Sequence, residues 1–171
     1  MSNKIKLGLI GLSAGNGHPY SWSAIINGYN KSLMKKCEFP LIYKYLKKQK
    51  FPHDQIKNAE VSHIWTQNLE LSKKIARTTK IKYIVNNFRD LLGKVDAILL
   101  ARDDADNHIK YSRIFLENKI PVYIDKPLSF SIKKAKKLIS FQKYNGQIFT
   151  CSALRYAKEF ESIKKIKKKI D

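Results

Sequence analysis

Three polar segments of this sequence combine residue types that bind phosphate or polarise an oxygen atom. The first is Gly11 to His18 (GLSAGNGH), which follows a short apolar run. The second, Ala101 to His108 (ARDDADNH), and the third, Tyr123 to Leu128 (YIDKPL), also begin where an apolar run ends. Ligands of parallel sheets bind at the carboxyl ends of the strands. We therefore expect the three segments to meet in one site.

The glycine-rich segment is typical of a turn that holds a pyrophosphate. Such a turn lets backbone N–H groups and a helix N-terminus face the phosphates. Read against the pattern G-x-G-x-x-G, Gly11 fits, Ser13 and Asn16 take the second and third glycine positions, and Gly15 and Gly17 lie out of register. The segment predicts cofactor contacts from Gly11, Ser13, Gly15 and Asn16 in an altered cradle, with a merely tight turn as the alternative.

The end of the second expected strand bears on the choice of cofactor. A fold that prefers NAD usually places Asp or Glu there, on the adenosine ribose hydroxyls. Here the residues are Thr66, Gln67 and Asn68, and the nearest cations, Lys73 and Lys74, lie one to two helical turns further on. No carboxylate would repel a 2′-phosphate, so the sequence permits either NAD or NADP.

Alternating strands and helices predict an α/β fold, a doubly wound parallel sheet of the Rossmann type. The expected strands are 5–10, 61–66, 82–85, 95–101, 121–124 and 147–153, and the expected helices are 21–29, 69–78, 88–92, 107–118 and 131–144. Residues 31–60 interrupt the alternation, and we interpret them as an inserted helical segment. Its Phe39–Pro40 and Phe51–Pro52 pairs are expected to end helices.

Charge and cysteine content argue against several other classes of protein. The 171 residues carry a formal charge of +20, but only five of the 34 cationic residues are Arg, so we expect no specific nucleic-acid binding. No apolar run could cross a bilayer, and two cysteines are too few for a disulfide framework. Asp106 fits the N-cap of the helix that follows, and we expect no metal at the neighbouring carboxylates. We expect a cytoplasmic protein without a membrane partner.

Together these segments resemble the Gfo/Idh/MocA family of NAD(P)-dependent oxidoreductases. That family has an alanine, a short polar loop and a His at the fourth strand of its N-terminal Rossmann domain, and a Glu-Lys-Pro after the fifth strand. Here Ala101 and His108 are followed, seventeen residues after the His, by Asp125-Lys126-Pro127. The resemblance covers nearly the whole chain.

The resemblance implies roles for individual residues. Lys126 would be catalytic: it would lie between nicotinamide and substrate carbinol, where a cation stabilises the alkoxide that develops as hydride leaves. Asp125 stands where the family usually has Glu, and Pro127 would fix the backbone after Lys126. Further cofactor contacts are implied at Thr66, Gln67, Ala101, Arg102, Asp103 and His108, in a loop one residue longer than the family's.

The end of the chain affects what activity to expect. In the family a second α+β domain supplies the substrate pocket, whereas this sequence ends at Asp171. We expect residues 1–153 to form the Rossmann domain and residues 154–171 to begin an absent second domain, with an amphipathic helix over 157–170. The apolar face of such a helix would favour a homo-oligomer or a separately encoded second half.

Two functions remain open at this point. The first is an oxidoreductase domain that binds a nicotinamide dinucleotide for hydride transfer at a sugar- or cyclitol-like carbinol, although this chain alone could be inactive. The second is a non-catalytic, truncated remnant or a nucleotide-binding interaction module.

Overall fold

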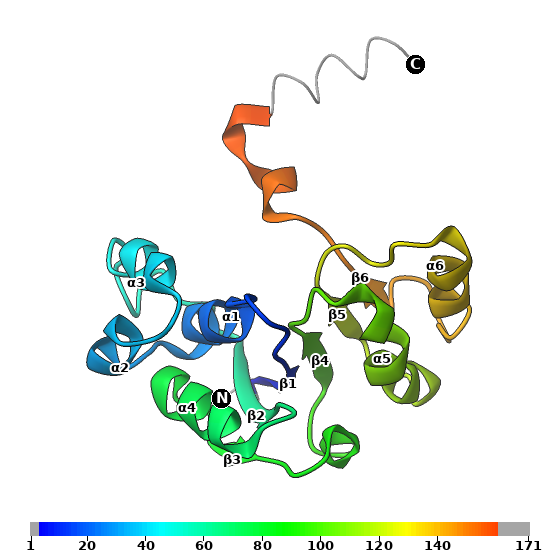
Figure 1. Ribbon diagram of the computed structural model, residues 1–171, viewed down its shortest axis with the longest axis horizontal. Helices are drawn as coiled ribbons and strands as arrows, with labels where there is room; N and C mark the ends of the chain where they lie inside the picture. Colours follow the sequence, from blue (N-terminus) through cyan, green and yellow to red (C-terminus); the bar gives the residue numbers. More distant parts are fainter. Residues whose placement is uncertain (1–3, 161–171) are drawn as a thin grey trace.

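A parallel β-sheet lies at the centre of the molecule, whose computed structural model describes residues 4–160. The strand order is β3-β2-β1-β4-β5-β6, and each strand pairs in parallel with its neighbours (Figure 1). The order runs outward from β1 in both directions, so the carboxyl ends of β1 and β4 flank a crevice. The strands are β1 (Ile5–Ile10), β2 (Ala59–Trp65), β3 (Tyr83–Ile84), β4 (Ala97–Leu100), β5 (Val122–Ile124) and β6 (Ile148–Phe149).

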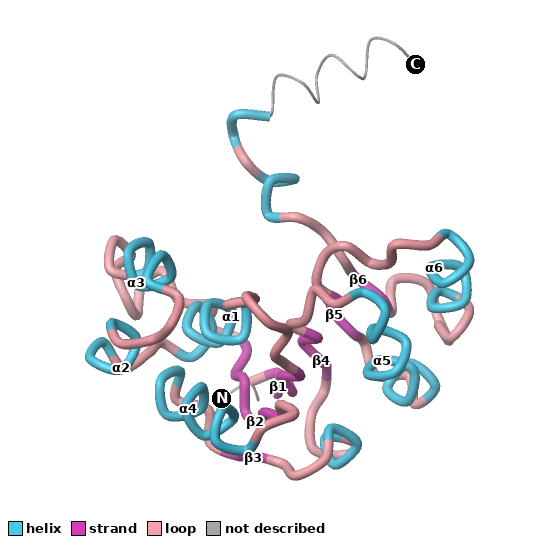
Figure 2. Tube along the Cα trace, viewed as in Figure 1, coloured by secondary structure: helices cyan, strands magenta, loops and turns pink. Residues whose placement is uncertain are grey.

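Helices cover both faces of the sheet, as the colouring in Figure 2 makes clear. One face carries α1 (His18–Asn27), α2 (Lys31–Lys35), α3 (Pro40–Leu46) and α4 (Leu69–Thr79), and the other carries α5 (His108–Glu117) and α6 (Ile132–Ile139). This is the doubly wound α/β architecture of the Rossmann fold that the sequence predicted. None of the helices between residues 4 and 160 has the length and apolarity that a bilayer crossing requires.

The alternation of side chains along β1 divides the core into two layers. Leu9 packs into the cluster formed with α1 and α4, and Ile10 packs into the cluster formed with α5. Both side chains have no exposed surface. Successive strand residues point to opposite faces of a sheet, so the apolar run of β1 serves both layers at once.

The insertion packs as two short helices against the α1 face. Asn30 caps α2 by accepting a hydrogen bond from the backbone N–H of Leu33 at 3.2 Å. Met34, Ile42 and Leu46 are buried in the core cluster of this face. The expectation that the Phe39–Pro40 pair ends a helix is wrong, because Pro40 begins α3, and proline suits the first turn since its missing N–H is not needed there.

Several element boundaries differ from those expected. Helix α1 begins at His18, three residues before the predicted start, with a proline in its first turn. Helix α6 ends at Ile139, and β6 has two residues only. The predicted helical turn at residues 88–92 is a 3-10 turn, Phe88–Leu91. Asp106 is not an N-cap: it lies inside the 3-10 turn Ala105–Asn107, and its carboxylate pairs with Lys134 Nζ at 2.5 Å.

The chain beyond β6 leaves the sheet. It forms two 3-10 turns, Ala153–Tyr156 and Lys158–Phe160, in the segment that rises away from the body of the molecule in Figure 1. The predicted helix over 157–170 falls largely on residues 161–171, which lie outside the described residues. Ala157 itself has an extended backbone, with φ −67° and ψ 132°.

Candidate functional site

The glycine turn after β1 presents open backbone at the carboxyl edge of the sheet. A Cβ on Gly11 would lie 2.7 Å from Pro19 Cγ, so glycine at this position lets α1 pack closely on β1. Gly15 has φ +76°, and a Cβ there would meet nothing within 4 Å. Ala14 and Gly15 are exposed, and between residues 4 and 160 no group accepts a hydrogen bond from the backbone N–H of Ser13, Ala14 or Gly15. The tip of the turn therefore offers free donors to an anion.

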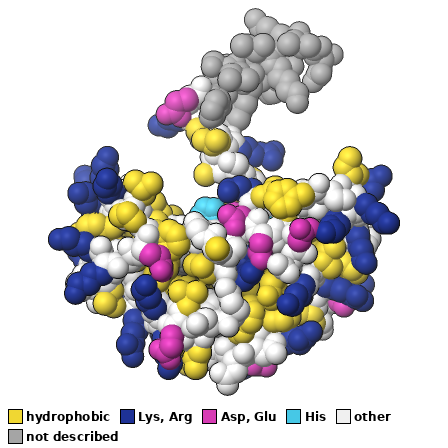
Figure 3. All heavy atoms as spheres, viewed as in Figure 1, with side chains coloured by type: hydrophobic (Ala, Val, Ile, Leu, Met, Phe, Trp, Pro, Cys, Tyr) yellow, Lys and Arg dark blue, Asp and Glu magenta, His cyan; other side chains and the backbone are white. Residues whose placement is uncertain are grey.

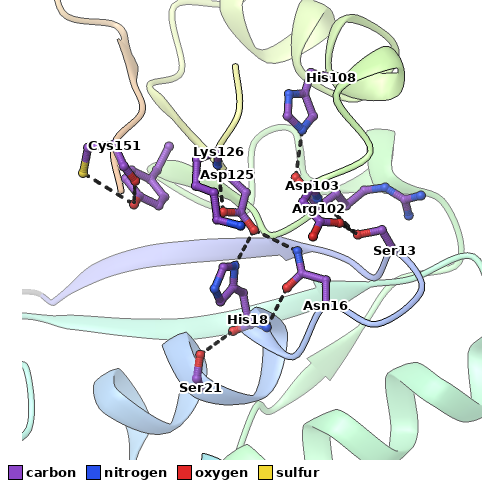
Figure 4. A network of polar contacts seen from close by, with 11 residues as sticks. Ser13, Asn16, His18, Ser21, Arg102, Asp103, His108, Asp125, Lys126 and Cys151 are labelled. Carbon is purple, nitrogen blue, oxygen red and sulfur yellow. Dashed lines mark hydrogen bonds and ion pairs between the residues drawn. The ribbon is translucent and has the colours of Figure 1, made fainter. Parts of the chain in front are cut away.

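The two side chains that replace glycines in the motif point away from this tip. Ser13 Oγ donates to Asp103 Oδ1 at 2.5 Å and accepts from the backbone N–H of Asp103 at 3.1 Å. Asn16 Nδ2 donates to Asp125 Oδ2 at 2.8 Å. Figure 4 shows both side chains reaching from the turn to the loops after β4 and β5. They join the loops of the site and leave the tip uncovered.

Asp125, at the end of β5, is the most enclosed carboxylate of the site. It is 1 % exposed, and its Oδ2 contacts both Asn16 and Nδ1 of His18 (Figure 4). Its Oδ1 accepts from the backbone N–H of Lys126 at 2.8 Å. Burial alone would raise the pKa of Asp125, but the hydrogen bonds from His18 and Asn16 outweigh it and leave the pKa below its usual value. The carboxylate is therefore ionised near neutral pH.

Lys126 and Pro127 follow Asp125 at the surface. Both residues are exposed, and the peptide bond that joins them is cis. Lys126 is thus accessible from solvent beside a buried, ionised carboxylate. A cation in this position can stabilise negative charge on a bound oxygen.

The loop after β4 is held by Ala101 and His108. Ala101 is fully buried and continues the ladder through its N–H to Ile10 O at 2.8 Å. The fully buried His108 ring lies with Nδ1 3.0 Å from Leu128 O and Nε2 2.8 Å from Arg102 O. His108 therefore connects the β4 loop to the β5 turn, and in this arrangement it is enclosed by protein.

Arg102 fills the space between the ends of β4 and β2. Its guanidinium forms a two-point pair with Asp104, at 2.9 and 2.6 Å, and also donates to Leu12 O at 3.1 Å and to Gln67 Oε1 at 3.0 Å. Burial would raise the pKa of Asp104, yet hydrogen bonds from Arg102 and Asn107 lower it. Arg102 is only 6 % exposed, so it serves here as an internal clamp.

The residues at the end of β2 are also engaged within the protein. Gln67 Nε2 donates to Leu12 O at 2.7 Å, and Gln67 Oε1 accepts from the Leu12 N–H at 3.2 Å. The Thr66 hydroxyl is buried and bonds to Asn68 O at 2.6 Å and to Ser72 Oγ at 2.9 Å. Both side chains are held in place by these bonds: Thr66 is buried, whereas Gln67 is exposed to solvent.

The carboxylates of the β4 loop take three different partners: Asp103 bonds Ser13, Asp104 pairs with Arg102, and Asp106 pairs with Lys134. Among the described residues, no three His, Cys, Asp or Glu side chains are grouped so that they could hold a metal ion.

The sequence matches a known family of oxidoreductases. Residues 43–152, more than half of the chain, match the model of the Gfo/Idh/MocA oxidoreductase family, described as having an NAD-binding Rossmann fold. The chain belongs to this family. The matched span includes β2 to β6 and the Asp125–Pro127 turn, and it begins after the glycine turn. No protein of curated function matches the sequence.

Solved structures of Gfo/Idh/MocA proteins share the fold. The myo-inositol dehydrogenase of Lactobacillus casei, in complex with NAD(H) and myo-inositol, has a TM-score of 0.68 at 15% identity and covers 97% of this chain. A Gfo/Idh/MocA family oxidoreductase from Vibrio cholerae gives 0.65 at 18% identity over 94%, and a probable dehydrogenase from Thermotoga maritima gives 0.64 at 16% over 96%. This chain spans only 42%, 42% and 41% of those proteins, respectively.

Two residues of this Gfo/Idh/MocA site, His18 and Asp104, had no specific role predicted from the sequence. In the structure, His18 contacts Asp125, and its ring stacks on Trp22 with centroids 4.8 Å apart. Asp104 forms an ion pair with Arg102, which the sequence did not predict. The position of His18 beside the glycine turn was the available signal, but 107 residues separate it from Asp125, and no local pattern reports such a contact.

Proposed function

We propose that this Gfo/Idh/MocA chain binds NAD or NADP at the carboxyl edge of β1, β4 and β5, and that it serves hydride transfer at a sugar- or cyclitol-like carbinol. The observation that carries the proposal is the meeting of an open glycine turn with the Asp125–Lys126–Pro127 turn at one edge of the sheet. That edge is where doubly wound folds bind dinucleotides.

The pyrophosphate would bind at the tip of the glycine turn. The N–H groups of Ser13, Ala14 and Gly15 are free of partners within residues 4–160, and the N-terminus of α1 lies directly behind them. Both features attract an anion. Ser13 and Asn16 do not crowd this position, because their side chains bond to Asp103 and Asp125. The altered motif thus still fits a diphosphate.

A nicotinamide cofactor, when bound, would accept or supply the hydride. In our proposal Lys126 is the catalytic residue, because its exposed cation can stabilise the carbinol oxygen as charge develops on it. Asp125 would hold the turn, because its buried carboxylate accepts hydrogen bonds from Asn16 and from the backbone N–H of Lys126, and we propose that it lies next to the cofactor ribose. A sugar- or cyclitol-like substrate is supported by the family and by the myo-inositol seen with the Lactobacillus casei neighbour.

The adenosine end of the site supports binding of both cofactors without strong discrimination. No carboxylate lies at the end of β2, and Gln67 is bonded to Leu12. The nearby cations Lys73 and Lys74 pair with Glu70 and Glu38 on the surface. Neither the ribose hydroxyls of NAD nor the 2′-phosphate of NADP has a dedicated partner here, so we expect dissociation constants within about tenfold of each other, a difference below about 1.4 kcal/mol.

The test is a fluorescence and calorimetric titration of the chain with NADH and NADPH. Ala14→Asp places a carboxylate at the exposed tip of the turn and is expected to weaken both affinities at least tenfold, by repelling the pyrophosphate. Asn145→Asp adds the same charge at the amino edge of the sheet, near the start of β6, and should leave both affinities within about twofold. Lys126→Met should also preserve binding and abolish turnover.

A nucleotide-binding module without catalysis is the second candidate, and it is favoured by the internal engagement of Thr66, Gln67 and Arg102. This candidate would be supported if the chain binds NADH or NADPH but turns over none of a series of polyols and sugars. Absence of NADH and NADPH binding to the wild-type chain would remove both.

A further inference from the structure

The His18–Asp125 pair has the geometry of an oriented proton acceptor. Asp125 accepts from three donors of the described chain: Nδ1 of His18, Nδ2 of Asn16 at 2.8 Å and the N–H of Lys126 at 2.8 Å. An ionised carboxylate only accepts hydrogen bonds, so Nδ1 of His18 must carry a proton. A neutral imidazole has one N–H, and the lone pair therefore resides on Nε2.

The ring of His18 is placed so that this lone pair is usable. Its side chain is 34% exposed, whereas that of Asp125 is 2% exposed. The ring is held flat against Trp22, with an interplanar angle of 12°. Within residues 4–160, Nε2 of His18 has no hydrogen-bond partner. Its orientation is fixed from one side by Asp125 and from one face by Trp22, and Nε2 remains free.

A cavity adjoins this ring. It has a volume of about 580 Å³, and its lining includes His18, Trp22, Glu38, Tyr45 and Ala153. The walls come from α1, the α2–α3 insertion and the segment after β6. Figure 3 shows the molecule hollowed between its two flanks, with a histidine side chain reaching the surface there. A small polar molecule fits such a space.

We propose that His18 is the general base of the reaction, oriented by Asp125 and working beside Lys126. The inference rests on the proposed function. A substrate hydroxyl would give its proton to Nε2 of His18, and a bound nicotinamide dinucleotide would accept the hydride from the same carbon, so that a carbonyl would form. In the reverse direction the imidazolium returns the proton. The base thus comes from the Rossmann part of the chain, and Asp125 is its positioning residue.

Three observations support this role over a purely structural tie. Asn16 already connects the glycine turn to the end of β5, because its Nδ2 donates to the same oxygen, Oδ2 of Asp125. The ring is partly exposed next to a cavity, whereas the structural His108 is fully enclosed with both nitrogens facing carbonyl oxygens. The turn that bears Lys126 is directly bonded to Asp125, which places acid–base and oxyanion-stabilising groups at one edge.

The first experiment needs no cofactor. Nitrogen-15 NMR of the chain should show neutral His18 with Nδ1 protonated and Nε2 unprotonated, and Asp125→Asn should shift the ring toward the Nε2–H form. His53 is the internal control, because its Nδ1 lies 2.8 Å from Asp54 but its side chain is 83% exposed, so solvent is expected to mix its tautomers. A wild-type His18 that carries its proton on Nε2 would overturn the proposal.

The second experiment separates a role of His18 as general base from a purely structural role in its hydrogen bond to Asp125. His18→Asn keeps an amide N–H near the position of Nδ1, so the bond to Asp125 and the NADH affinity should survive, whereas kcat of the full chain with NAD and myo-inositol as the probe substrate should fall at least about 100-fold. His18→Gln lacks that bond and should lose stability as well. Turnover within about threefold of wild type in His18→Asn sinks the base role. Loss of NADH binding in the wild type instead refutes the proposed function, and the NMR result still decides the orientation of His18.

Discussion

Asp125 gathers the polar contacts of the site around one buried carboxylate. The donors come from the turn after β1, from the first residue of α1 and from its own turn. The family usually has Glu at this position, and one methylene less keeps the carboxylate close to the sheet. Asn16, in a position where the motif has glycine, supplies the amide that meets it. The side chains of Asn16 and Asp125 are therefore joined by a direct hydrogen bond.

The lowered pKa of Asp125 predicts a pH dependence of stability. A carboxylate whose folded pKa lies below its unfolded value adds stability above the unfolded pKa, and that stability is lost as pH falls through the folded pKa. We expect Asp125→Asn to lower the free energy of unfolding at pH 7, and the difference from wild type to shrink between about pH 5 and pH 3. Urea denaturation at a series of pH values measures this difference.

Asp106→Asn is the matched control for that series. Asp106 is exposed and its pair with Lys134 lies on the surface, where such pairs contribute about 0–1 kcal/mol. Its effect should be small at every pH. A penalty for Asp125→Asn that stays constant down to pH 3 would contradict the ionised, hydrogen-bonded carboxylate.

At the scale of elements, the glycine turn is braced by the insertion. A Cβ on Gly17 would lie 2.7 Å from Ile42 Cδ1 and 2.9 Å from Phe39 Cγ. The start of α1 therefore packs directly on the segment that begins α3. The insertion, which the sequence showed only as a break in the alternation, supports the turn that we propose binds phosphate.

Gly17→Ala should accordingly destabilise the fold by about 1–3 kcal/mol, since overpacking forces the neighbours to move. Phe39→Ala removes one of the two obstructing side chains and should recover part of that loss in the double variant. A double-mutant cycle by thermal or urea denaturation gives the coupling. Strictly additive effects would show that the two residues do not share this contact.

The order of strands and helices could be predicted from the sequence because the local periodicity of apolar residues agrees with the burial of those residues in the fold. The apolar runs of β1, β2 and β4 were identified to within two residues at their ends. The start of α1 was missed because Gly17 and Pro19 signal a turn as strongly as a helix start. The length of α6 was overestimated because its Lys-rich periodicity continues beyond the residues that pack, of which Leu138 is the buried one.

At the scale of the whole molecule, the positive charge within residues 4–160 is spread over many exposed lysines. Figure 3 shows Lys and Arg over both flanks of the body, on helices of either face. The guanidinium of Arg102, which lies at the candidate site, is buried and bonded to Asp104 and to the carbonyl oxygen of Leu12. The exposed charge is therefore mostly that of solvated lysines, which attract polyanions without selecting among them.

We therefore expect weak, sequence-independent binding to duplex DNA that falls at least tenfold between about 50 and 200 mM salt, through release of counterions. Fluorescence anisotropy with two unrelated duplexes over a salt series tests this. Replacing Lys133, Lys136 and Lys137 of α6 by Gln should lower the salt slope without changing NADH affinity. A tenfold preference for one duplex would point to a specific nucleic-acid function and against this interpretation.

The sequence by itself determined the fold class, the family and the segments that meet at the sheet edge, because strand periodicity, glycine turns and the Asp125–Pro127 motif are local patterns. Only the tertiary structure decided which side chains remain available there. It turned Ser13 and Asn16 inward, closed Gln67 and Arg102 onto Leu12, and brought His18 to Asp125. Hydrogen bonds between residues some 50 to 110 positions apart depend on how the strands are ordered in space, and that order is not written in any one segment of the chain.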